Sequence, residues 1–534
     1  MSALRPMDVD RRLGIRAAVL ILVSVMGAMT LAPESLAMPI TAAELRLTPC
    51  EQKTREGEAT ADCGTLVVPE NRAMPQARMI SLPVIRIRAT GRNPGEPLFW
   101  LEGGPGQTNV GFQPPASLLA RHDFVMVGYR GVDGSNVLDC PEVSNALDGV
   151  NGDLLSDASR RHLAEAASAC ARRLQGQGVD LAGYTMAEVV ADLEMARTAL
   201  GYGTINLLSE SYGTRIAQIY AALHPERLSR SAMIGVNPPG HFVWEPGVID
   251  AQLRDYARLC AADQICRGRT SNLAATISKV SHNMPKRWLL FPIDPGKVKV
   301  VTFLLLFNRG SAAMVFDAYL AAEKGDASGL ALLSIASDFA LPRIGVWGDF
   351  LAKGSADFDP ARDYKKSLAP AGSILGSPLS LLLFDGLLRN WPVQPLSAAL
   401  SRVQPSAVET LLVSGSVDFS TPPQFATNEL LPNLAKGQQV ILRQMGHTTD
   451  IWGLQPQATE HLLNSFYETG VGDTSHYVDA PMDFRPRFAL PLVAKLVLAT
   501  GLLLLGASGA GVALAVRRIR RRSNHFPHGS ATRR

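Results

Sequence analysis

Three polar residues that follow predicted strands form a possible catalytic set. Ser211 lies in Ser209-Glu210-Ser211-Tyr212-Gly213, where a tight strand-to-helix turn with small outer residues would lift the central hydroxyl above a sheet. Asp418 follows the apolar run 409–416, and His447 follows the run 438–445, 29 residues beyond Asp418. A serine hydroxyl becomes a strong nucleophile when a histidine accepts its proton and an aspartate holds that histidine. The three residues therefore indicate acyl-transfer chemistry.

Each of these residues also has an ordinary structural interpretation. A serine before a helix can be an N-cap, an aspartate in a loop can be solvated, and a lone histidine is commonly a surface residue. Their order along the chain favours catalysis, because Ser211, Asp418 and His447 each follow a strand of one predicted sheet. Serine, then aspartate, then histidine is the order found in α/β-hydrolases.

A glycine loop follows another predicted strand. Glu102-Gly103-Gly104-Pro105-Gly106 comes directly after the apolar residues 97–101. Glycines let backbone N–H groups approach an oxyanion without interference from Cβ, and the N–H of Tyr212 would be aimed at the same charge. The loop lacks the lysine of a phosphate-binding loop and the G-x-G-x-x-G spacing, so nucleotide binding is disfavoured. A plain tight turn is the alternative.

The elements that must position these residues alternate between strands and helices. Helices are expected at 155–175, at 186–200 and up to about 223, and short apolar strands at 64–69, 80–89, 97–104, 123–131, 205–210, 231–236, 409–416 and 438–445. Such strands are typical of an α/β fold with a mostly parallel sheet covered on both faces, where ligands gather at the carboxyl ends of the strands. Residues 241–395 break the pattern and predict an inserted helical cap.

Both ends of the chain resemble export or membrane segments. Four arginines precede the uncharged run 17–32, and Ser35 and Ala37 suit a cleavage site, so a signal peptide is expected, with an uncleaved anchor as the alternative. Residues 496–516 carry no charge and are long enough to cross a ~30 Å hydrocarbon layer. Five arginines follow at 517–522, and basic residues stay on the cytoplasmic side. The body is therefore expected outside the cytoplasm, at a cell membrane.

These observations divide the chain into segments. We expect a signal peptide over 1–37, a hydrolase core over 38–240 and 396–470, a helical cap over 241–395, a linker over 471–487, a transmembrane helix over 488–516 and a basic cytoplasmic tail over 517–534. A buried core helix is the alternative for 488–516. The sequence leaves the oligomeric state open.

The net charge of +4 comes from the two ends. Residues 1–37 hold four basic and three acidic residues, and residues 489–534 hold eight basic residues and no acidic ones. The rest of the chain keeps 40 basic and 45 acidic residues, a net charge of −5. A mildly acidic body argues against a nucleic-acid partner. At 46% hydrophobic and 19% charged residues, the chain is suited to a large buried core rather than to disorder.

The cysteines suit an exported protein. They are even in number and fall into three local pairs, Cys50 and Cys63, Cys140 and Cys170, and Cys260 and Cys266. Short loops make these pairs the simplest disulfide pattern, although other pairings and free thiols are alternatives. No cysteines form C-x-x-C and no histidine stands at metal-finger spacing, so neither a metal nor a cofactor is expected.

The motifs taken together resemble a known group of enzymes. They are GGPG at 103–106, YRGVDGS at 129–135, Tyr184-Thr185 with Asp192-Leu193, SESYGT at 209–214, GSVDFSTP at 415–422, MGHT at 445–448 and, at the start, CGTLVVP at 63–69. This series is similar to that of secreted α/β-hydrolase serine peptidases related to prolyl iminopeptidase and tripeptidyl aminopeptidase, over roughly 50–240 and 395–465. The resemblance implies that Ser211 is the nucleophile, that Asp418 and His447 complete the triad, and that Gly104 and Tyr212 supply oxyanion donors.

The chain also departs from that group at three positions. Glu102 stands where prolyl iminopeptidases have a histidine, Gly128 where many relatives have an aspartate, and Ser209 where the turn usually has its first glycine. These differences leave the fold prediction intact and weaken any exact statement about the substrate.

An aminopeptidase also needs a carboxylate to hold the substrate's ammonium group. Glu245, at the start of the predicted cap, and Glu210, beside the nucleophile, are the candidates, and each could equally have only a structural role. We expect a serine peptidase that removes proline or a short peptide from N-termini. The alternatives are an ester hydrolase with the same triad and a non-catalytic binding module on the same fold. The expected partner is a peptide or a small acyl substrate.

Overall fold

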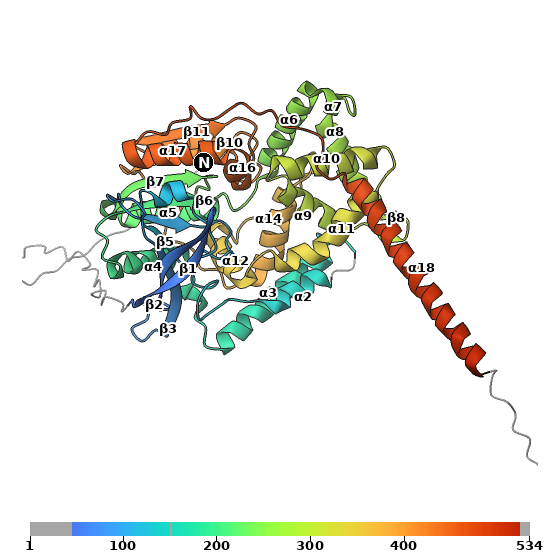
Figure 1. Cartoon of the computed structure of the whole chain (residues 1–534), viewed down its shortest axis with the longest axis horizontal. Helices are drawn as coiled ribbons and strands as arrows, with labels where there is room; N and C mark the ends of the chain where they lie inside the picture. The colour runs from blue at the N-terminus through green and yellow to red at the C-terminus, as the bar shows by residue number, and fades with distance from the viewer. Residues whose placement is uncertain (1–44, 150–151, 524–534) are drawn as a thin grey trace, which may run out of the picture. The chain divides into compact units, whose positions relative to one another are not determined.

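The computed structural model describes residues 45–149 and 152–523. The predicted signal peptide over 1–37 and the last part of the predicted tail, 524–534, lie outside the described residues. Within the described range, one sheet organises the chain (Figure 1).

The sheet has nine strands in the order β1-β2-β3-β5-β4-β6-β7-β10-β11. Their bounds are Leu47–Thr54 (β1), Gly57–Pro69 (β2), Met79–Ile87 (β3), Leu98–Leu101 (β4), Phe124–Val127 (β5), Ile205–Glu210 (β6), Leu228–Ile234 (β7), Glu409–Gly415 (β10) and Gly437–Leu442 (β11). Strands β1, β2 and β3 pair antiparallel, as do β3 and β5, and every pairing from β5 to β11 is parallel. The predicted mostly parallel sheet is confirmed, and β1 is a strand that the sequence analysis did not identify.

The register of the parallel strands brings their carboxyl ends to one edge. Leu101 at the end of β4 pairs with Ser209, and Glu210 at the end of β6 pairs with Ile234 at the end of β7. Strand β10 pairs with β7 up to Ile234 and ends nearby at Gly415. Parallel strands with matched ends release their following loops at the same edge, which is where such sheets bind ligands.

Apolar residues fill both faces of the sheet. In β4, Phe99 and Leu101 belong to one cluster of buried side chains, whereas Leu98 and Trp100 belong to another. Successive side chains of a strand point to opposite faces, so these two clusters lie on opposite sides of the sheet. This explains the uninterrupted apolar runs in the sequence, since a strand covered on both faces has no polar side.

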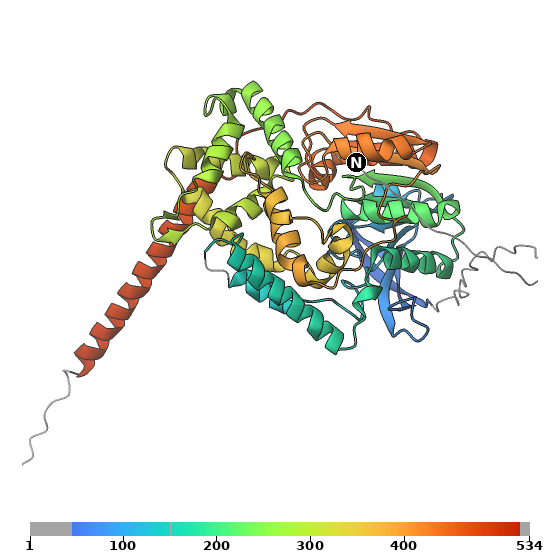
Figure 2. The same cartoon turned by 180° about the vertical axis from the view of Figure 1, so that it is seen from behind.

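Helices supply the covering layers (Figures 1 and 2). Helices α1 (Ala116–Leu119), α16 (Thr448–Leu454) and α17 (Pro456–Thr469) contribute to the cluster that contains Trp100. The other cluster receives α2 (Pro141–Asp148), α3 (Asp157–Gly176), α4 (Met186–Ala199) and α5 (Tyr212–Leu223). Side-chain oxygens of Ser156 and Thr185 cap α3 and α4 by accepting hydrogen bonds from the backbone, which fixes where these helices begin.

The stretch between β7 and β10 is helical apart from one small hairpin, in agreement with the predicted cap. Its helices are α6 (Pro246–Ala262), α7 (Gln264–Arg267), α8 (Leu273–His282), α9 (Pro295–Leu305), α10 (Arg309–Glu323), α11 (Ser328–Ala340), α12 (Trp347–Gly354), α13 (Tyr364–Leu368), α14 (Pro378–Ser380), η5 (Leu381–Gly386) and η6 (Leu387–Asn390). The hairpin consists of β8 (Arg287–Trp288) and β9 (Phe291–Pro292). Short helical turns complete the chain at Leu181–Gly183, Pro225–Arg227, Leu341–Arg343, Ser355–Asp357, Pro423–Phe425, Ala426–Leu430 and Leu431–Asn433.

The three predicted disulfides are confirmed. Cys50 is bonded to Cys63, Cys140 to Cys170 and Cys260 to Cys266. They link β1 to β2, the start of α2 to α3, and α6 to α7. Disulfides of this kind form in oxidising compartments, which supports an exported protein.

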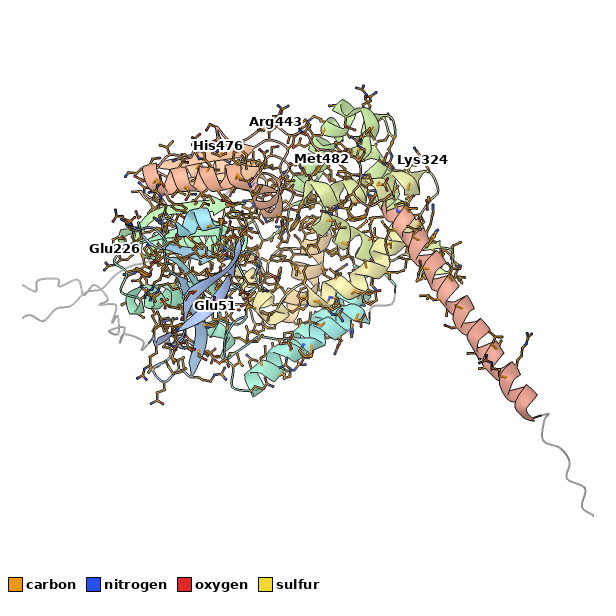
Figure 3. All side chains as sticks on the ribbon, in the orientation of Figure 1. Glu51, Glu226, Lys324, Arg443, His476 and Met482 are labelled. Atoms are coloured by element: carbon orange, nitrogen blue, oxygen red, sulfur yellow. A yellow bond between two sulfur atoms is a disulfide. The ribbon has the colours of Figure 1, made fainter. Side chains whose placement is uncertain are left out.

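The segment predicted as a linker, 471–487, packs against the body. Met482, labelled in Figure 3, is buried, as is Phe484. The backbone N–H of Met482 donates to Oε1 of Gln444 at 2.7 Å, and Arg309 donates to the carbonyl of Ala480 at 2.7 Å. This segment is therefore held by contacts along its length, up to the start of α18.

Helix α18 (Leu490–Ser523) covers the predicted transmembrane range. Its first turns touch the cap, where Lys495 pairs with Asp326 at 2.6 Å and the hydroxyl of Ser328 donates to the carbonyl of Pro491 at 3.3 Å. Further along, Leu503 and Leu505 are more than two-thirds exposed. The membrane span itself stays a prediction.

Taken over residues 45–149 and 152–523, no single helix has both the length and the apolar character needed to cross a membrane. One bent pair of helices, Ser328–Arg343 with Trp347–Asp357, has that length and composition only when the two are taken together, and Leu490–Leu505 is a shorter apolar helix.

Candidate active site

Ser211 occupies the tight turn between β6 and α5. Its backbone has φ 50° and ψ −120°, a strained conformation for a residue with a side chain, and such strain gathers at functional sites. The turn fits only because a glycine follows two residues later, since a Cβ on Gly213 would lie 2.2 Å from the carbonyl oxygen of Leu101. Ser209 takes the place of the usual first glycine, and its buried hydroxyl donates to the carbonyl of Ala232 at 3.2 Å.

Asp418 and His447 form a hydrogen-bonded pair. Nδ1 of His447 lies 2.8 Å from Oδ2 of Asp418. The carboxylate of Asp418 has no exposure to solvent and accepts further hydrogen bonds from the backbone N–H groups of Ser420 and Thr421 and from the Thr421 hydroxyl. Hydrogen bonds to every side of a buried carboxylate stabilise its charge, so Asp418 is held in place to orient the imidazole.

The imidazole of His447 is fixed from several directions. Its backbone N–H donates to the carbonyl of Phe307 in the cap at 2.7 Å, and the Phe307 ring packs edge-on against it. A Cβ on Gly235, at the end of β7, would lie 2.9 Å from Cε1 of His447. Because Nδ1 is engaged by Asp418, Nε2 is the nitrogen left to exchange a proton with a nucleophile.

Ser211 and His447 line the same cavity, which has a volume of about 240 Å³. Its floor comes from the sheet edge, through the turn of Ser211 and the loop of Gly103 and Gly104. Most of its walls are apolar side chains that the cap supplies, among them Phe307, Trp347, Phe350, Leu383, Phe384 and Leu388. A largely apolar cavity with a few convergent polar groups is the usual form of a binding site.

The glycine loop also lies at this cavity. Gly104 has φ +123°, which a residue with a side chain rarely adopts, and it lines the cavity together with Tyr212. The N–H groups on either side of Gly104 are engaged: Gly103 donates to Oε1 of Glu102 at 2.9 Å, and Gly106 donates to Oδ2 of Asp349 at 3.0 Å. Tyr212 is the first residue of α5, where backbone N–H groups have no partner within the helix.

A buried ion pair in the cap, which the sequence analysis missed, supports that loop. Asp349 and Lys353 lie one turn apart on α12, bonded to each other, with no measurable exposure. Burial raises the pKa of Asp349 and lowers the pKa of Lys353, and their mutual attraction opposes both shifts. Lys353 also donates to the carbonyl of Arg130 at 2.8 Å. The pair thus joins the cap to the Gly106 loop and to the loop after β5.

Glu102, Glu210 and Glu245, which the sequence analysis singled out, lie in different surroundings. Glu102 and Glu210 line the cavity, and Oε2 of Glu210 accepts a hydrogen bond from Nε1 of Trp452 at 2.9 Å. Burial raises the pKa of Glu210 well above the ordinary carboxyl value, and the neighbouring Glu102 raises it further. Glu245 is not among the cavity-lining residues, and its carboxylate accepts two hydrogen bonds from Arg362 at 2.7 and 2.9 Å.

Arg130 and Asp192, two residues of the motifs, form a buried ion pair away from the cavity. Arg130 donates to both carboxylate oxygens of Asp192 at 2.6 and 2.7 Å, and both side chains are buried. Gly128, where many relatives have an aspartate, also has a steric reason, because a Cβ there would lie 2.6 Å from Cδ of Pro83. These residues hold the loop after β5 rather than line the cavity.

Comparison with known proteins agrees with this geometry. A family model for the alpha/beta hydrolase fold matches residues 96–264. A tripeptidyl aminopeptidase of Streptomyces coelicolor is 30% identical over 207 residues, which cover 35% of this chain and 37% of that protein. The serine protease Hip1 of Mycobacterium tuberculosis is 26% identical over 464 residues, covering 76% of this chain and 85% of that protein. The chain thus matches little more than a third of the aminopeptidase's length.

Solved structures of low similarity are also found. A serine hydrolase from Cycloclasticus zankles has 11% sequence identity and a TM-score of 0.35, covering 76% of this chain and 98% of that one. A likeness of that size supports no statement about activity. The sheet order, the strained turn and the sequence matches confirm the resemblance inferred from the motifs: this chain has the α/β-hydrolase fold and is related to serine peptidases of that fold.

Proposed function

We propose that this chain is an exported serine peptidase that cleaves peptides close to their N-termini through an acyl-enzyme. Ser211 is the nucleophile, His447 the general base and acid, and Asp418 the residue that orients His447. The observation that carries the proposal is the 2.8 Å bond between His447 and Asp418, together with Ser211 at a strained turn on the same cavity.

The reaction follows from these positions. Nε2 of His447 accepts the proton of the Ser211 hydroxyl while Oγ attacks the substrate carbonyl carbon. The negative oxygen that forms is stabilised by the N–H groups of Tyr212 and Gly104. His447 then gives its proton to the leaving nitrogen, the C–N bond breaks, and the acyl group stays on Ser211. Water, deprotonated by His447, releases the acid and restores the serine.

A peptide substrate is favoured over an ester because the relatives found by sequence are named as peptidases. Amide cleavage also needs an imidazolium that is well stabilised, since a poor leaving group must be protonated, and the fully hydrogen-bonded Asp418 suits that role. Ester hydrolysis is the second candidate, because the apolar cap side chains would accept an acyl chain.

The two candidates are separated by turnover on matched substrates. The full-length chain is assayed on peptides with free N-termini and on short acyl esters, with Ser211→Ala as the control for background hydrolysis. We expect peptide cleavage that is lost in Ser211→Ala. Ester turnover without any peptide turnover would reject the peptidase proposal.

We also propose that the body lies outside the cytoplasm and that residues 496–516 anchor it in a membrane, with the basic tail inside. The three disulfides, the uncharged run in α18 and the arginines after it support this arrangement. Alkaline carbonate extraction of membranes tests the anchor. We expect the chain to stay in the pellet, and full release into the wash would reject the anchor.

A further inference from the structure

Two carboxyl groups lie beside the nucleophile and have no part in the triad. Glu210 directly precedes Ser211, and Glu102 begins the loop that carries Gly103 and Gly104. A Cβ placed on Gly103 would lie 3.2 Å from Cβ of Ser211 and 3.8 Å from Oε1 of Glu210. The nucleophile and this carboxyl group therefore flank the same glycine, within reach of a single bound substrate.

The acidic side chains of the cavity are gathered at this point. Within the part of the chain that the structure describes, Glu102 and Glu210 are the acidic residues among the cavity-lining side chains, and no lysine or arginine lines the cavity. The neighbouring groups are Trp452 on α16, which donates a hydrogen bond to Glu210, and the cavity-lining residues Thr448 and His447. Arg55 lies behind the Trp452 ring, 5.3 Å from its centre, and not among the lining residues.

The two carboxyl groups influence each other. Burial and the neighbouring Glu102 raise the pKa of Glu210 well above the ordinary carboxyl value, so Glu210 keeps its proton to a higher pH than an exposed glutamate does. A cation that enters the cavity favours the ionised form of Glu210, which then releases its proton to solvent.

A second feature of the cavity also indicates a polar occupant. The buried side chains of Tyr212 and Trp347 line it, and among the described residues the Tyr212 hydroxyl and the Trp347 indole N–H have no hydrogen-bond partner. Buried donors are normally satisfied, so these two suit a ligand that brings acceptors. The carbonyl groups of a peptide are such acceptors, and an acyl chain has none beyond its ester group.

We propose that Glu102 and Glu210 bind the N-terminal ammonium of a peptide substrate. This inference rests on the proposed peptidase function, and it identifies the residues that restrict cleavage to peptides with free N-termini. The ammonium donates hydrogen bonds to one oxygen of each carboxylate, and the proton that Glu210 releases passes to solvent. With the ammonium held beside Ser211, cleavage falls a short distance from the N-terminus.

Paired substrates and neutral variants test the ammonium site. The full-length wild type is incubated with a mixture of short peptides that carry free N-termini and with the same mixture after N-acetylation, and products are identified by mass spectrometry. For the peptide cleaved fastest, Glu210→Gln and the double variant Glu102→Gln/Glu210→Gln should lower kcat/KM about 10- to 100-fold more for the free peptide than for its acetylated form. Glu245→Gln, which changes a carboxylate outside the cavity, should keep the wild-type ratio.

The proton itself gives a second readout. In Ser211→Ala, calorimetric titration with the free peptide in buffers of different ionisation enthalpy should show proton release on binding. The release should disappear in Ser211→Ala/Glu210→Gln and with the acetylated peptide. A purely structural role for the two glutamates would leave the same buffer dependence in Ser211→Ala and in Ser211→Ala/Glu210→Gln.

The outcomes separate this inference from the proposed function. Equal cleavage of free and acetylated peptides would overturn the ammonium site and leave the peptidase proposal standing. Cleavage that requires a free C-terminal carboxylate instead would also overturn it, because the pair would then act as a donor to an anion. Absence of cleavage of any peptide would reject the proposed function itself.

Discussion

The sheet and the cap contribute to the cavity in different ways. The sheet edge supplies the reacting groups, since Ser211, Asp418 and His447 each follow a strand whose neighbours are fixed by hydrogen bonds. The cap supplies mostly apolar walls and touches the sheet edge through polar contacts, among them Phe307 to His447, Gln252 to the carbonyl of Asp418 and Asp349 to Gly106. The comparison places the proposed chemistry and the proposed ammonium site at the sheet edge, and the apolar part of the cavity on the helical insertion.

The largest expected effect comes from removing the reacting groups. Ser211→Ala and His447→Ala should each lower kcat about 10⁴- to 10⁶-fold, and the double variant should lose little more, because the triad acts as a unit. Turnover of the best peptide substrate measures this, with circular dichroism to confirm folding. Additive losses in the double variant would contradict a shared mechanism.

The next effect concerns the buried ion pair through which the cap supports the loop of Gly106. Asp349→Ala leaves the charge of Lys353 buried without its partner, which should cost about 3–5 kcal/mol of unfolding free energy. Urea denaturation measures the loss.

Asp349→Leu/Lys353→Met removes both charges and should recover most of that stability. The double variant still lacks the acceptor for the Gly106 N–H, so its kcat should stay lowered. If its kcat matched that of the wild type, the pair would have no role in positioning the loop.

The core and the cap can also be compared by the stability that a disulfide contributes to each. Cys140–Cys170 closes a loop of 30 residues and Cys260–Cys266 in the cap closes one of 6. Closing a longer loop removes more conformational entropy from the unfolded chain. Replacing both cysteines by serine should therefore lower the free energy of unfolding by about 3.5 kcal/mol for Cys140–Cys170 and by about 2 kcal/mol for Cys260–Cys266. Equal losses would indicate that strain or the unfolded chain, rather than loop length, decides the effect.

The smallest effect is a pH dependence of stability at the cavity. The pKa of Glu210 is raised in the folded state, so the folded chain keeps a proton that the unfolded chain has already lost. Stability therefore falls as pH rises from the ordinary carboxyl pKa toward the raised one, by up to about 1.4 kcal/mol per pH unit. Glu210→Gln should remove this slope in urea titrations at two pH values about one unit apart, just above the ordinary carboxyl pKa, and an unchanged slope would assign it to other buried acids.

The sequence predicts the sheet region well because its signals are local. Continuous apolar strands and the SESYG turn depend on neighbours in the chain, and the Ser–Asp–His order can be read directly along it. The structure brings Asp418 to His447 and places Ser211 on the same cavity, as those signals indicate. The sequence analysis missed strand β1 because its residues are mostly polar or exposed and include no run of apolar residues.

The cap resists such prediction because its important contacts join distant residues. Asp349 meets Gly106 across 243 positions, and Glu245 meets Arg362 across 117. Nothing near Glu245 in the sequence indicates that an arginine neutralises it, so its predicted role in ammonium binding lacks support from its position. The position of Glu102 and Glu210 at one cavity depends in the same way on the pairing of β4 with β6.

The central claim is that Ser211 is activated by His447. Labelling of the full-length chain with a fluorophosphonate, followed by peptide mass spectrometry, tests it most directly. We predict one modified residue, Ser211, in the wild type and almost no modification in His447→Ala. Modification of another residue, or equal labelling of Ser211 in His447→Ala, would contradict the account.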